Sequence, residues 1–308
     1  MILCHDYEKY KKHIKFPCIV QEKYDGLRVR VHVYDVPSNY INQPPERYAM
    51  MYTRANKEIH GYTEIRNILE TFPEGTYDGE LLYSGDVRQT GNGKANRKDR
   101  TVEDEQGAYI VLWDYIPHGL PLAPYIERIN FLRTLIHRAS IDSRYVQFAE
   151  TAYCDSMETL DCIYNGFIED GLEGIVVKNY NLMNPDGRTK DCLKRKKFYT
   201  CDLVVVNMLP GEGRLCGTMG ALRCTDSTGK LLVNVGSGFT DDQRYYWWSS
   251  QGEEEHIIEV KYNQIISDKR TPGLYSLFLP VFVKIRDDKT EADSVEEMRE
   301  TCVKLKQN

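Results

Sequence analysis

A lysine-bearing turn between two strands, at residues 21–28 (QEKYDGLR), is the feature that most constrains the fold of this chain. Residues 16–20 form an apolar run and residues 29–33 alternate apolar and polar, as β-strands do, and the Asp-Gly pair between them is typical of a tight turn. Lys23 is therefore expected at a fixed position beside paired strands. A lysine followed two residues later by Asp-Gly belongs either to an ordinary surface turn or to the site of a nucleophile, and this short pattern alone does not decide between them.

The composition describes a globular protein with enough chain for two domains. At about 150 residues per domain, 308 residues predict two domains, and 41% hydrophobic with 28% charged residues is ordinary for such proteins. No apolar run approaches the roughly 20 residues that span a bilayer, and the N-terminus lacks the apolar core of a signal peptide. Nine cysteines without a C-x-x-C pair favour free thiols in a reducing compartment over disulfides or a zinc site.

The net charge of −6 would argue against nucleic-acid binding if acidic and basic residues were evenly mixed. The basic residues are instead clustered in two stretches, and a clustered charge sets the local potential whatever the total is. Each cluster is either a solvated loop or a surface for phosphate groups. The clusters are Arg88, Lys94, Arg97, Lys98 and Arg100, and Arg188, Lys190, Lys194, Arg195, Lys196 and Lys197.

Residues 1–198 mix strand and helix patterns and are expected to form the first domain. Residues 84–107 are glycine-rich and charged without apolar periodicity, and a mobile loop is expected there. A polar turn rich in proline is expected at residues 35–46. Helices are expected at 5–15, 62–71, 124–139 and 156–170, and strands at 16–20, 29–33, 49–54, 77–83, 109–115, 145–149, 174–178 and 193–198.

From residue 199 to residue 308 the pattern changes to short strands separated by turn residues. Five such strands in about 110 residues fit a small closed barrel of the oligonucleotide/oligosaccharide-binding (OB) type. A terminal helix follows, because Ser294 and Glu297 have the spacing of a capping box. The expected strands are 202–208, 219–225, 230–235, 255–263 and 280–285.

Four further segments of the first domain carry side chains that suit one reaction. Glu80 ends an Asp-Gly-Glu triplet in a strand. Glu173 and Lys178 lie at the two ends of another strand. Two lysines alternate along a strand and so share one of its faces. Each feature alone fits a structural role, as an edge charge, a solvated face or a core ring, but their joint presence in this order favours a site. The residues are Glu80, Glu173 with Lys178, Lys194 with Lys196, and Trp113.

These segments resemble the ordered motifs of the ATP-dependent DNA ligases, which are covalent nucleotidyltransferases. The matching segments are KYDGLR, TRANKEI, YDGELLY, VLWDY, EGIVVK and LKRK, followed by RDDK at residues 286–289. RQTGNGKAN, LLVNVGSGFTDD and LFLPVFVKIRDDKTEAD resemble the tailed-bacteriophage type in particular. The resemblance covers essentially the whole chain. It departs in one respect, since Lys23 is too near the start for the N-terminal DNA-binding domain of larger ligases, which this chain is expected to lack.

The resemblance implies an α+β fold. A nucleotidyltransferase domain of antiparallel sheets with flanking helices is followed by an OB-fold domain. It also implies that Lys23 attacks the α-phosphate of ATP and becomes linked to AMP. At neutral pH only about one unperturbed lysine in a thousand is uncharged, so nearby cations must favour the neutral amine. Lys178, Lys194, Lys196 and Mg²⁺ are the candidates, with Glu80 and Glu173 as oxygen ligands of the metal, whereas Asp25 is assigned to positioning.

Further nucleotide contacts follow from the resemblance and are assigned by matching motifs. Gln21 is expected beside the adenine and Trp113 on its face, and Glu80 also near the ribose. Arg28 and Arg54 are expected at the sugar and at the 5′-phosphate of the DNA. The remaining contacts are Arg188 and Lys194 at the nucleotide, and Arg286 and Lys289 at the pyrophosphate, where they matter mainly in the first step.

The implied substrate is nicked duplex DNA, gripped through its phosphates by lysine and arginine side chains. In a second step AMP moves to the 5′-phosphate of the nick, and in a third the 3′-hydroxyl displaces it. The basic loop at residues 84–100 is expected to become ordered on nicked DNA. The resemblance further implies a monomer that acts in the cytoplasm, that of the host if the gene is viral, without membrane contact.

Several alternatives remain open on the residues alone. An RNA ligase shares the chemistry, but the complete barrel with its RDDK ending and the YDGLR form of the first motif disfavour it. An mRNA guanylyltransferase uses GTP, and no RNA triphosphatase or methyltransferase segment accompanies the motifs here. An NAD-dependent ligase needs a nicotinamide-binding domain before the lysine, and none is expected in this sequence. A non-catalytic nucleic-acid-binding module would have no use for an intact nucleophile.

Overall fold

The computed structural model divides the chain into two compact units, Met1–Lys196 and Lys197–Asn308. Sequence patterns place the boundary between residues 198 and 199. No helix among the described residues is long and apolar enough to cross a membrane. The structure describes residues 1–37, 44–85, 102–119, 122–138, 142, 144–183, 187–250, 256–267 and 271–307.

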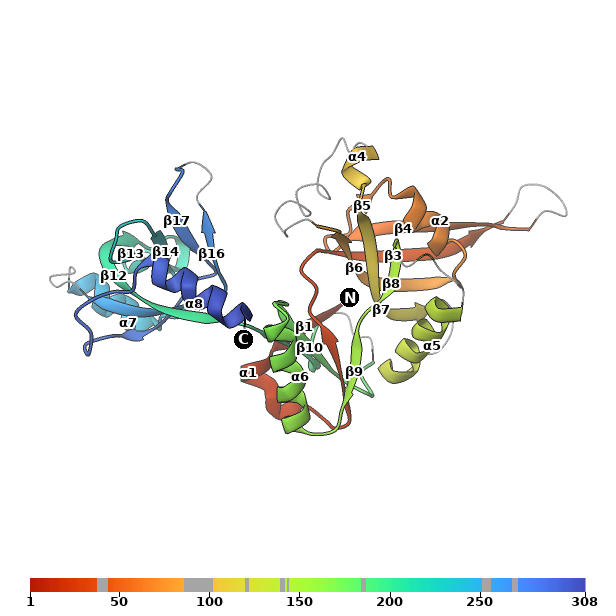
Figure 1. Cartoon of the computed structure of the whole chain (residues 1–308), viewed down its shortest axis with the longest axis horizontal. Coiled ribbons are helices and arrows are strands. Elements are labelled where there is room, and N and C mark those ends of the chain that lie inside the picture. Colours follow the sequence, from red (N-terminus) through yellow and green to blue (C-terminus); the bar gives the residue numbers. More distant parts are fainter. Residues whose placement is uncertain are drawn as a thin grey trace. The chain divides into compact units, whose positions relative to one another are not determined.

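A six-stranded sheet forms the larger layer of the first unit, in the order β5-β4-β3-β6-β7-β8 (Figure 1). Val29, Val31 and Val33 alternate along β3 and are fully buried, so this strand presents one face to the core. Helices α2 (Thr63–Leu69) and α5 (Tyr125–Arg138) supply the apolar residues that pack against that face. The strands are β3 (Leu27–Val36), β4 (Glu46–Thr53), β5 (Glu58–Ile59), β6 (Gly75–Tyr83), β7 (Ala108–Pro117) and β8 (Val146–Phe148).

A five-stranded sheet forms the second layer, in the order β1-β11-β10-β2-β9. Helices α1 (Tyr7–Tyr10), followed by a 3₁₀ turn at Lys11–His13, and α6 (Met157–Glu169) pack against it, as Figure 1 shows. The two sheets are mainly antiparallel, as expected, but β1 runs parallel to β11 and β7 runs parallel to β8. The strands are β1 (Ile2–Asp6), β2 (Cys18–Glu22), β9 (Thr151–Cys154), β10 (Gly174–Asn179) and β11 (Gly187–Lys196).

The turn that carries Lys23 connects the two sheets, because β2 belongs to one and β3 to the other. The Lys23 amide donates a hydrogen bond to the Gly174 carbonyl at 2.9 Å, which fixes the start of the turn against β10. A Cβ atom on Gly26 would lie 2.4 Å from the Leu81 carbonyl oxygen, so the end of the turn lies against β6 at a distance that only glycine permits. The nucleophile candidate is therefore held at the junction of two sheets.

The second unit contains a five-stranded sheet in the order β14-β13-β12-β15-β18, with the extra hairpin β16–β17. A bridge between Ser237, just after β14, and Val281 in β18 joins the two edge strands and closes the sheet into a barrel. Trp247 of α7 (Asp241–Ser249) and Met298 of α8 (Val295–Gln307) complete its core. The strands are β12 (Tyr199–Pro210), β13 (Met219–Thr225), β14 (Leu232–Val235), β15 (Ile257–Tyr262), β16 (Gln264–Ser267), β17 (Tyr275–Phe278) and β18 (Val281–Ile285), with a 3₁₀ turn at Gly213–Leu215.

Most predicted elements are confirmed, including the helices at 62–71, 124–139 and 156–170 and the capping box of α8. The single helix predicted over 5–15 is wrong in part, because its first residues belong to β1. The prediction of a structureless loop over 84–107 is wrong at Val102–Glu105, which form the short helix α4. The basic loop residues themselves fall at 86–101, outside the described residues. Sequence patterns did not predict β9, α7 or the β16–β17 hairpin.

Candidate active site

A cavity of about 300 Å³ lies within the first unit beside the Lys23 turn. Strands of both sheets contribute to its wall, so residues far apart in sequence meet there. Among the candidates in this unit, Glu173 is not part of the wall but contacts two lysines that are. The candidates that line the cavity are Gln21, Lys23, Arg28, Arg54, Glu80, Trp113, Lys178, Arg188, Lys194 and Lys196.

Lys23 and Lys196 share the carboxylate of Glu173. The Nζ atom of Lys23 lies 2.5 Å from Oε2, and Lys196 pairs with Oε1 of the same group. Burial alone would raise the pKa of Glu173, but attraction to the two ammonium groups outweighs burial and lowers it. Burial and repulsion from Lys23 lower the pKa of Lys196. The nucleophile candidate is thus held by an ionised carboxylate, with a second cation beside it.

Glu80 is the second carboxylate near the turn, and it is in a different electrostatic environment. It is 9% exposed, and burial raises its pKa to about 7, although Lys23, the Gly26 amide and Arg28 act in the opposite direction. The Gly26 amide donates to Oε1 of Glu80 at 3.1 Å. The β3/β6 register places Glu80 directly opposite Arg28, which is how two distant motifs reach the same site.

A buried hydrogen-bonded cluster lies at the Trp113 end of the cavity. Lys178 donates to Oε1 of Gln21 at 2.8 Å and to the hydroxyl of Tyr125 at 2.7 Å. That hydroxyl lies 2.6 Å from the Trp113 carbonyl oxygen, to which it donates, and Gln21 donates to Thr151 at 3.0 Å. Burial lowers the pKa of Lys178. The cluster fixes the side chains of Lys178 and Gln21 and the backbone of Trp113 relative to one another.

The arginine candidates differ in how firmly they are held. Arg28 forms a bidentate pair with Asp78, at 3.1 and 2.5 Å, and lies 5.7 Å from the Trp113 ring centroid. Arg188 is exposed and donates to the Cys4 carbonyl at 2.5 Å. Arg54 is exposed in the turn after β4. Arg28 is therefore preorganised, whereas the other two present their guanidinium groups at the mouth of the cavity.

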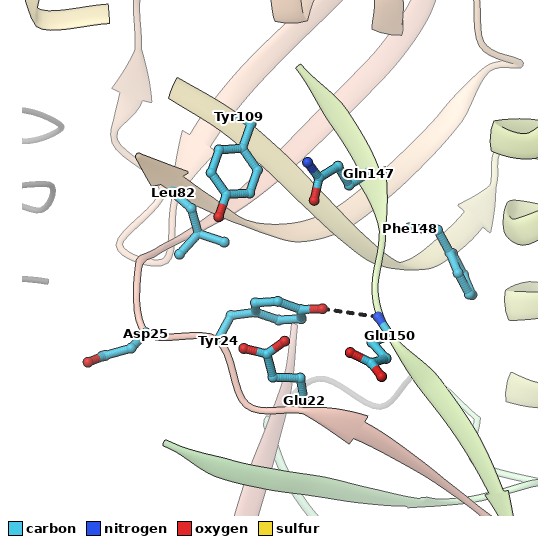
Figure 2. A pocket seen from close by; sticks show the side chains of 8 residues that line it. All are labelled: Glu22, Tyr24, Asp25, Leu82, Tyr109, Gln147, Phe148 and Glu150. Carbon is cyan, nitrogen blue, oxygen red and sulfur yellow. Dashed lines mark hydrogen bonds between the residues drawn. The ribbon is translucent and has the colours of Figure 1, made fainter. Parts of the chain in front are cut away.

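A second cavity, of about 470 Å³, lies on the other side of the turn. Figure 2 shows the ring of Tyr24 extending from the turn toward the segment between β8 and β9, where its hydroxyl accepts a hydrogen bond from the Glu150 amide at 3.0 Å. The side chain of Glu22 also bonds this phenol, and burial raises the pKa of the Glu22 carboxyl. Tyr24 thus fixes the backbone next to Lys23 from behind.

The two candidates in the second unit belong to a local acidic network. Arg286 donates to both oxygens of the buried Asp202, at 3.0 and 2.9 Å, and also pairs with Asp288 at 2.8 Å. Lys289 pairs with Asp202 as well and lies 3.6 Å from Asp293. The hydrogen bond that Lys289 donates to Asp202 raises the pKa of Lys289. Both candidates are charged and locally fixed within their own unit.

The donor atoms around Lys23 suit a hard cation such as Mg²⁺. Lys23 acts electrostatically on both Glu80 and Glu173, and oxygen ligands are what Mg²⁺ prefers. Among the described residues no group of three or more histidine, cysteine, aspartate or glutamate side chains could hold a metal ion. Mg²⁺ commonly takes one or two carboxylates with water and substrate phosphates, so this pair fits it.

Two protein-family profiles match this chain. The profile described as "ATP dependent DNA ligase domain" covers residues 2–196, more than half of the chain, and that described as "DNA ligase OB-like domain" covers residues 210–286. The chain belongs to the ATP-dependent DNA ligase family. ATP is therefore its nucleotide substrate and DNA its nucleic-acid partner.

Individual relatives agree with this assignment. The ligase is 24% identical to the DNA ligase of Enterobacteria phage T6, in an alignment that covers 96% of this chain and 69% of the phage protein. It is 33% identical to the DNA ligase of Archaeoglobus fulgidus over 53% of this chain and 34% of the archaeal one. The solved structure of Pmar-Lig_Pre superimposes with a TM-score of 0.79 at 24% identity, over 93% of this chain and 67% of that one. At this identity the superposition shows a common fold.

Sequence reasoning missed several residues of the ligase site. Tyr125 accepts a hydrogen bond from Lys178, Asp78 accepts from Arg28 and the Tyr24 carbonyl accepts from Lys23, and Cys4 and Cys192 line the cavity. Asp78 could have been recognised, since it lies in the same YDGE segment as Glu80 and alternation places both on one face of β6. Tyr24 lies next to Lys23 in the KYDGLR segment, whereas no local pattern distinguishes Tyr125, Cys4 or Cys192.

Proposed function

We propose that the ligase seals nicks with 3′-hydroxyl and 5′-phosphate ends in duplex DNA, through a lysyl-AMP on Lys23 and then an adenylylated DNA. The observation that supports this most directly is the position of Lys23. Its Nζ atom lies at a cavity whose wall carries a tryptophan, three further lysines and three arginines. Such a wall suits a nucleotide, with an aromatic face for the base and cations for the phosphates.

The residues of the first unit divide into a base end and a phosphate end. Trp113 would stack on the adenine, with Gln21 beside it. Glu80 and Arg28 would contact the sugar. Lys178, which is bonded to Gln21, would also lie at the base end. Lys194, Lys196, Arg54 and Arg188 would neutralise phosphate charge, on the nucleotide or on the DNA, and this neutralisation is the main demand of phosphoryl transfer.

Lys23 must lose a proton before its nitrogen can attack the α-phosphate of ATP and displace pyrophosphate. Glu173, which is ionised and bonded to Nζ, is placed to accept or orient that proton. Lys196 pairs with the other oxygen of Glu173 and would add positive charge beside the phosphates. Mg²⁺ held by Glu80 and Glu173 would supply charge neutralisation at the phosphates.

Several further assignments belong to the same proposal. Residues 1–198 would act as the nucleotidyltransferase domain and residues 199–308 as the OB-fold domain, whose Arg286 and Lys289 would orient the pyrophosphate. The ligase would work as a monomer on nicked duplex DNA in the cytoplasm, in replication, repair and recombination. A hypothesis that falls outside the described residues is the ordering of the basic loop at 84–100 on nicked DNA.

The test is sealing of a 5′-labelled nicked duplex with ATP and Mg²⁺, comparing the wild type with Lys23→Ala. The variant should form no covalent AMP adduct and seal no ordinary nick, but should still seal a nick that already carries 5′-AMP. Lys196→Ala serves as the matched control, because it removes a lysine from the same carboxylate and should slow adduct formation without abolishing it. An adduct on the Lys23→Ala protein would refute the assignment of the nucleophile.

A further inference from the structure

Two cysteines that are 188 residues apart in sequence meet in the wall of the nucleotide cavity. The Sγ atoms of Cys4 in β1 and Cys192 in β11 lie 3.1 Å apart. Both residues line the cavity, with Cys4 partly exposed and Cys192 only 1% exposed. A small oxidant that enters the cavity can therefore reach Cys4, with a second thiol directly behind it.

The backbone around the pair can adjust on one side. Cys4 pairs with Thr189 across the parallel ladder, and the next residue, His5, pairs with Leu193. Residues 190–192 are therefore out of register with β1, although Cys192 keeps its place opposite Lys178 in β10. Residues outside a ladder can shift without breaking its hydrogen bonds. The interrupted pairing beside Cys4 thus leaves the β1 backbone room to move toward Cys192, which is held against β10.

The charges around the pair make Cys4 the nucleophile and Cys192 the hydrogen-bond donor. The hydrogen bond from Cys192 is the main cause that lowers the pKa of Cys4 to about 6; burial opposes it, and the cations Lys178, Arg28 and Lys194 assist it. The same hydrogen bond and burial raise the pKa of Cys192. A thiolate next to a thiol is the arrangement of a reactive cysteine with a resolving partner.

We propose that Cys4 and Cys192 form an oxidation site, at which a peroxide produces a disulfide between β1 and β11 that slows formation of the lysyl-AMP. The Cys4 thiolate attacks one peroxide oxygen and breaks the O–O bond, leaving a sulfenic acid and hydroxide, which takes a proton from the solvent to give water. The sulfur of Cys192 then attacks the sulfenyl sulfur, loses its proton and releases a second water. In sum, two thiols are oxidised and one hydrogen peroxide is reduced to two waters.

The effect on catalysis rests on the function proposed above and follows from what β1 holds. The Cys4 carbonyl accepts the bond from Arg188, and the Ile2 carbonyl accepts one from Arg28 at 2.8 Å. A disulfide requires the sulfur atoms to close from 3.1 Å to about 2.05 Å. That movement shifts the backbone that positions two guanidinium groups, and it removes the thiolate charge that faces Lys178.

The chain contains an internal comparison for this site. Cys18 and Cys154 are directly opposite one another in the β2/β9 ladder, and both are buried. Burial raises the pKa of Cys18 to about 12, with the Cys154 sulfur adding to the effect, so this pair stays protonated at neutral pH. The Cys18–Cys154 pair therefore has two neighbouring thiols, like the proposed site, but no thiolate.

The experiment treats the full-length protein with hydrogen peroxide, alkylates the remaining thiols and maps disulfides by mass spectrometry without reduction. A peptide joining Cys4 to Cys192 is expected, formed faster than any joining Cys18 to Cys154. Transfer of labelled AMP from ATP to the oxidised protein should fall by on the order of tenfold and recover with dithiothreitol. The Cys192→Ser and Cys18→Ser variants are each compared with their own untreated activity; only the first should lose the reversible inhibition.

The two readouts separate the possible failures. Absence of the Cys4–Cys192 peptide, or its formation no faster than the Cys18–Cys154 peptide, overturns the oxidation site whether or not the protein is a working ligase. A disulfide that forms but leaves AMP transfer unchanged overturns the link to catalysis. Absence of AMP transfer in the untreated wild type would instead contradict the proposed function, while the disulfide mapping still tests the site.

Discussion

The carboxyl of Glu80 should give the metal-free ligase a pH-dependent stability of defined sign. Burial raises its pKa from an ordinary 4.5 to about 7. Because the folded pKa is above the unfolded one, the folded protein keeps a proton that the unfolded chain has already released. The resulting stabilisation is present in full below pH 4.5 and is lost as the pH rises through 7.

The magnitude follows from the two pKa values. Each tenfold difference in proton affinity between folded and unfolded states is worth about 1.4 kcal/mol, so the change from pH 4.5 to about pH 8 is worth about 3 kcal/mol. Glu80→Gln keeps the shape and cannot ionise, so its opening free energy should lack this component. The measurement is hydrogen–deuterium exchange of β6 peptides in EDTA over that pH range, which reports the first unit separately from the second.

Glu173→Gln is the matched control, because the attraction of two lysines lowers the pKa of Glu173. A lowered pKa has the opposite sign. The stabilisation from Glu173 is present above pH 4.5 and is lost only as the pH falls through its folded pKa. Over the range tested, the control should therefore run parallel to the wild type at a lower level. If Glu80→Gln also ran parallel to the wild type, the argument that burial keeps Glu80 protonated would be wrong.

Three further predictions test the rest of the site. Tyr125→Phe removes a buried hydroxyl that accepts a hydrogen bond from Lys178, so it should lower the unfolding free energy, measured by thermal melting, by about 2–3 kcal/mol and raise the KM for ATP. Tyr115→Phe is the control, since it loses one neutral hydrogen bond to a carbonyl and should lower the unfolding free energy by about 1 kcal/mol with an unchanged KM. Lys289→Ala should slow AMP transfer from ATP but not sealing of a pre-adenylylated nick, and equal losses in both assays would contradict a first-step role. Arg54→Ala should reduce the slope of log affinity for nicked DNA against log salt by about 0.9, and an unchanged slope would exclude a phosphate contact.

The sequence predicted the fold best where one strand or helix carries its own pattern. Val29, Val31 and Val33 alternate in β3, and that alternation alone identifies the strand and its buried face. The strand β1 is different, since its pairing partner β11 begins at Gly187 and a parallel ladder at that separation leaves no local pattern. The helix α7 was missed although its capping box, Thr240 with Gln243, is visible in the sequence, because the aromatic residues that follow lack helical periodicity.

The sequence predicted which residue types form the site and their order along the chain, but it did not predict the hydrogen bonds between them. Motif matching selected Lys178 and Gln21, and the structure shows that the Nζ atom of Lys178 donates a hydrogen bond to Oε1 of Gln21. Tyr125 completes that cluster from a helix outside every motif, so nothing in its neighbours marks it. Asp78 and Arg28 meet through the β3/β6 register, which depends on the packing of whole strands.

The two glutamates show most clearly what only the structure can supply. The sequence treats Glu80 and Glu173 alike, as carboxylates beside a strand with a candidate role at the metal. In the structure Glu173 has an ammonium group on each oxygen and is ionised, whereas Glu80 has a backbone amide on one oxygen and a raised pKa. Two carboxylates whose surroundings push their pKa values apart can hold different roles at one pH. At neutral pH Glu173 is therefore the ionised partner of Lys23 before ATP binds. Glu80 is the carboxyl whose ionisation increases when a further positive charge, such as a metal ion, binds beside it.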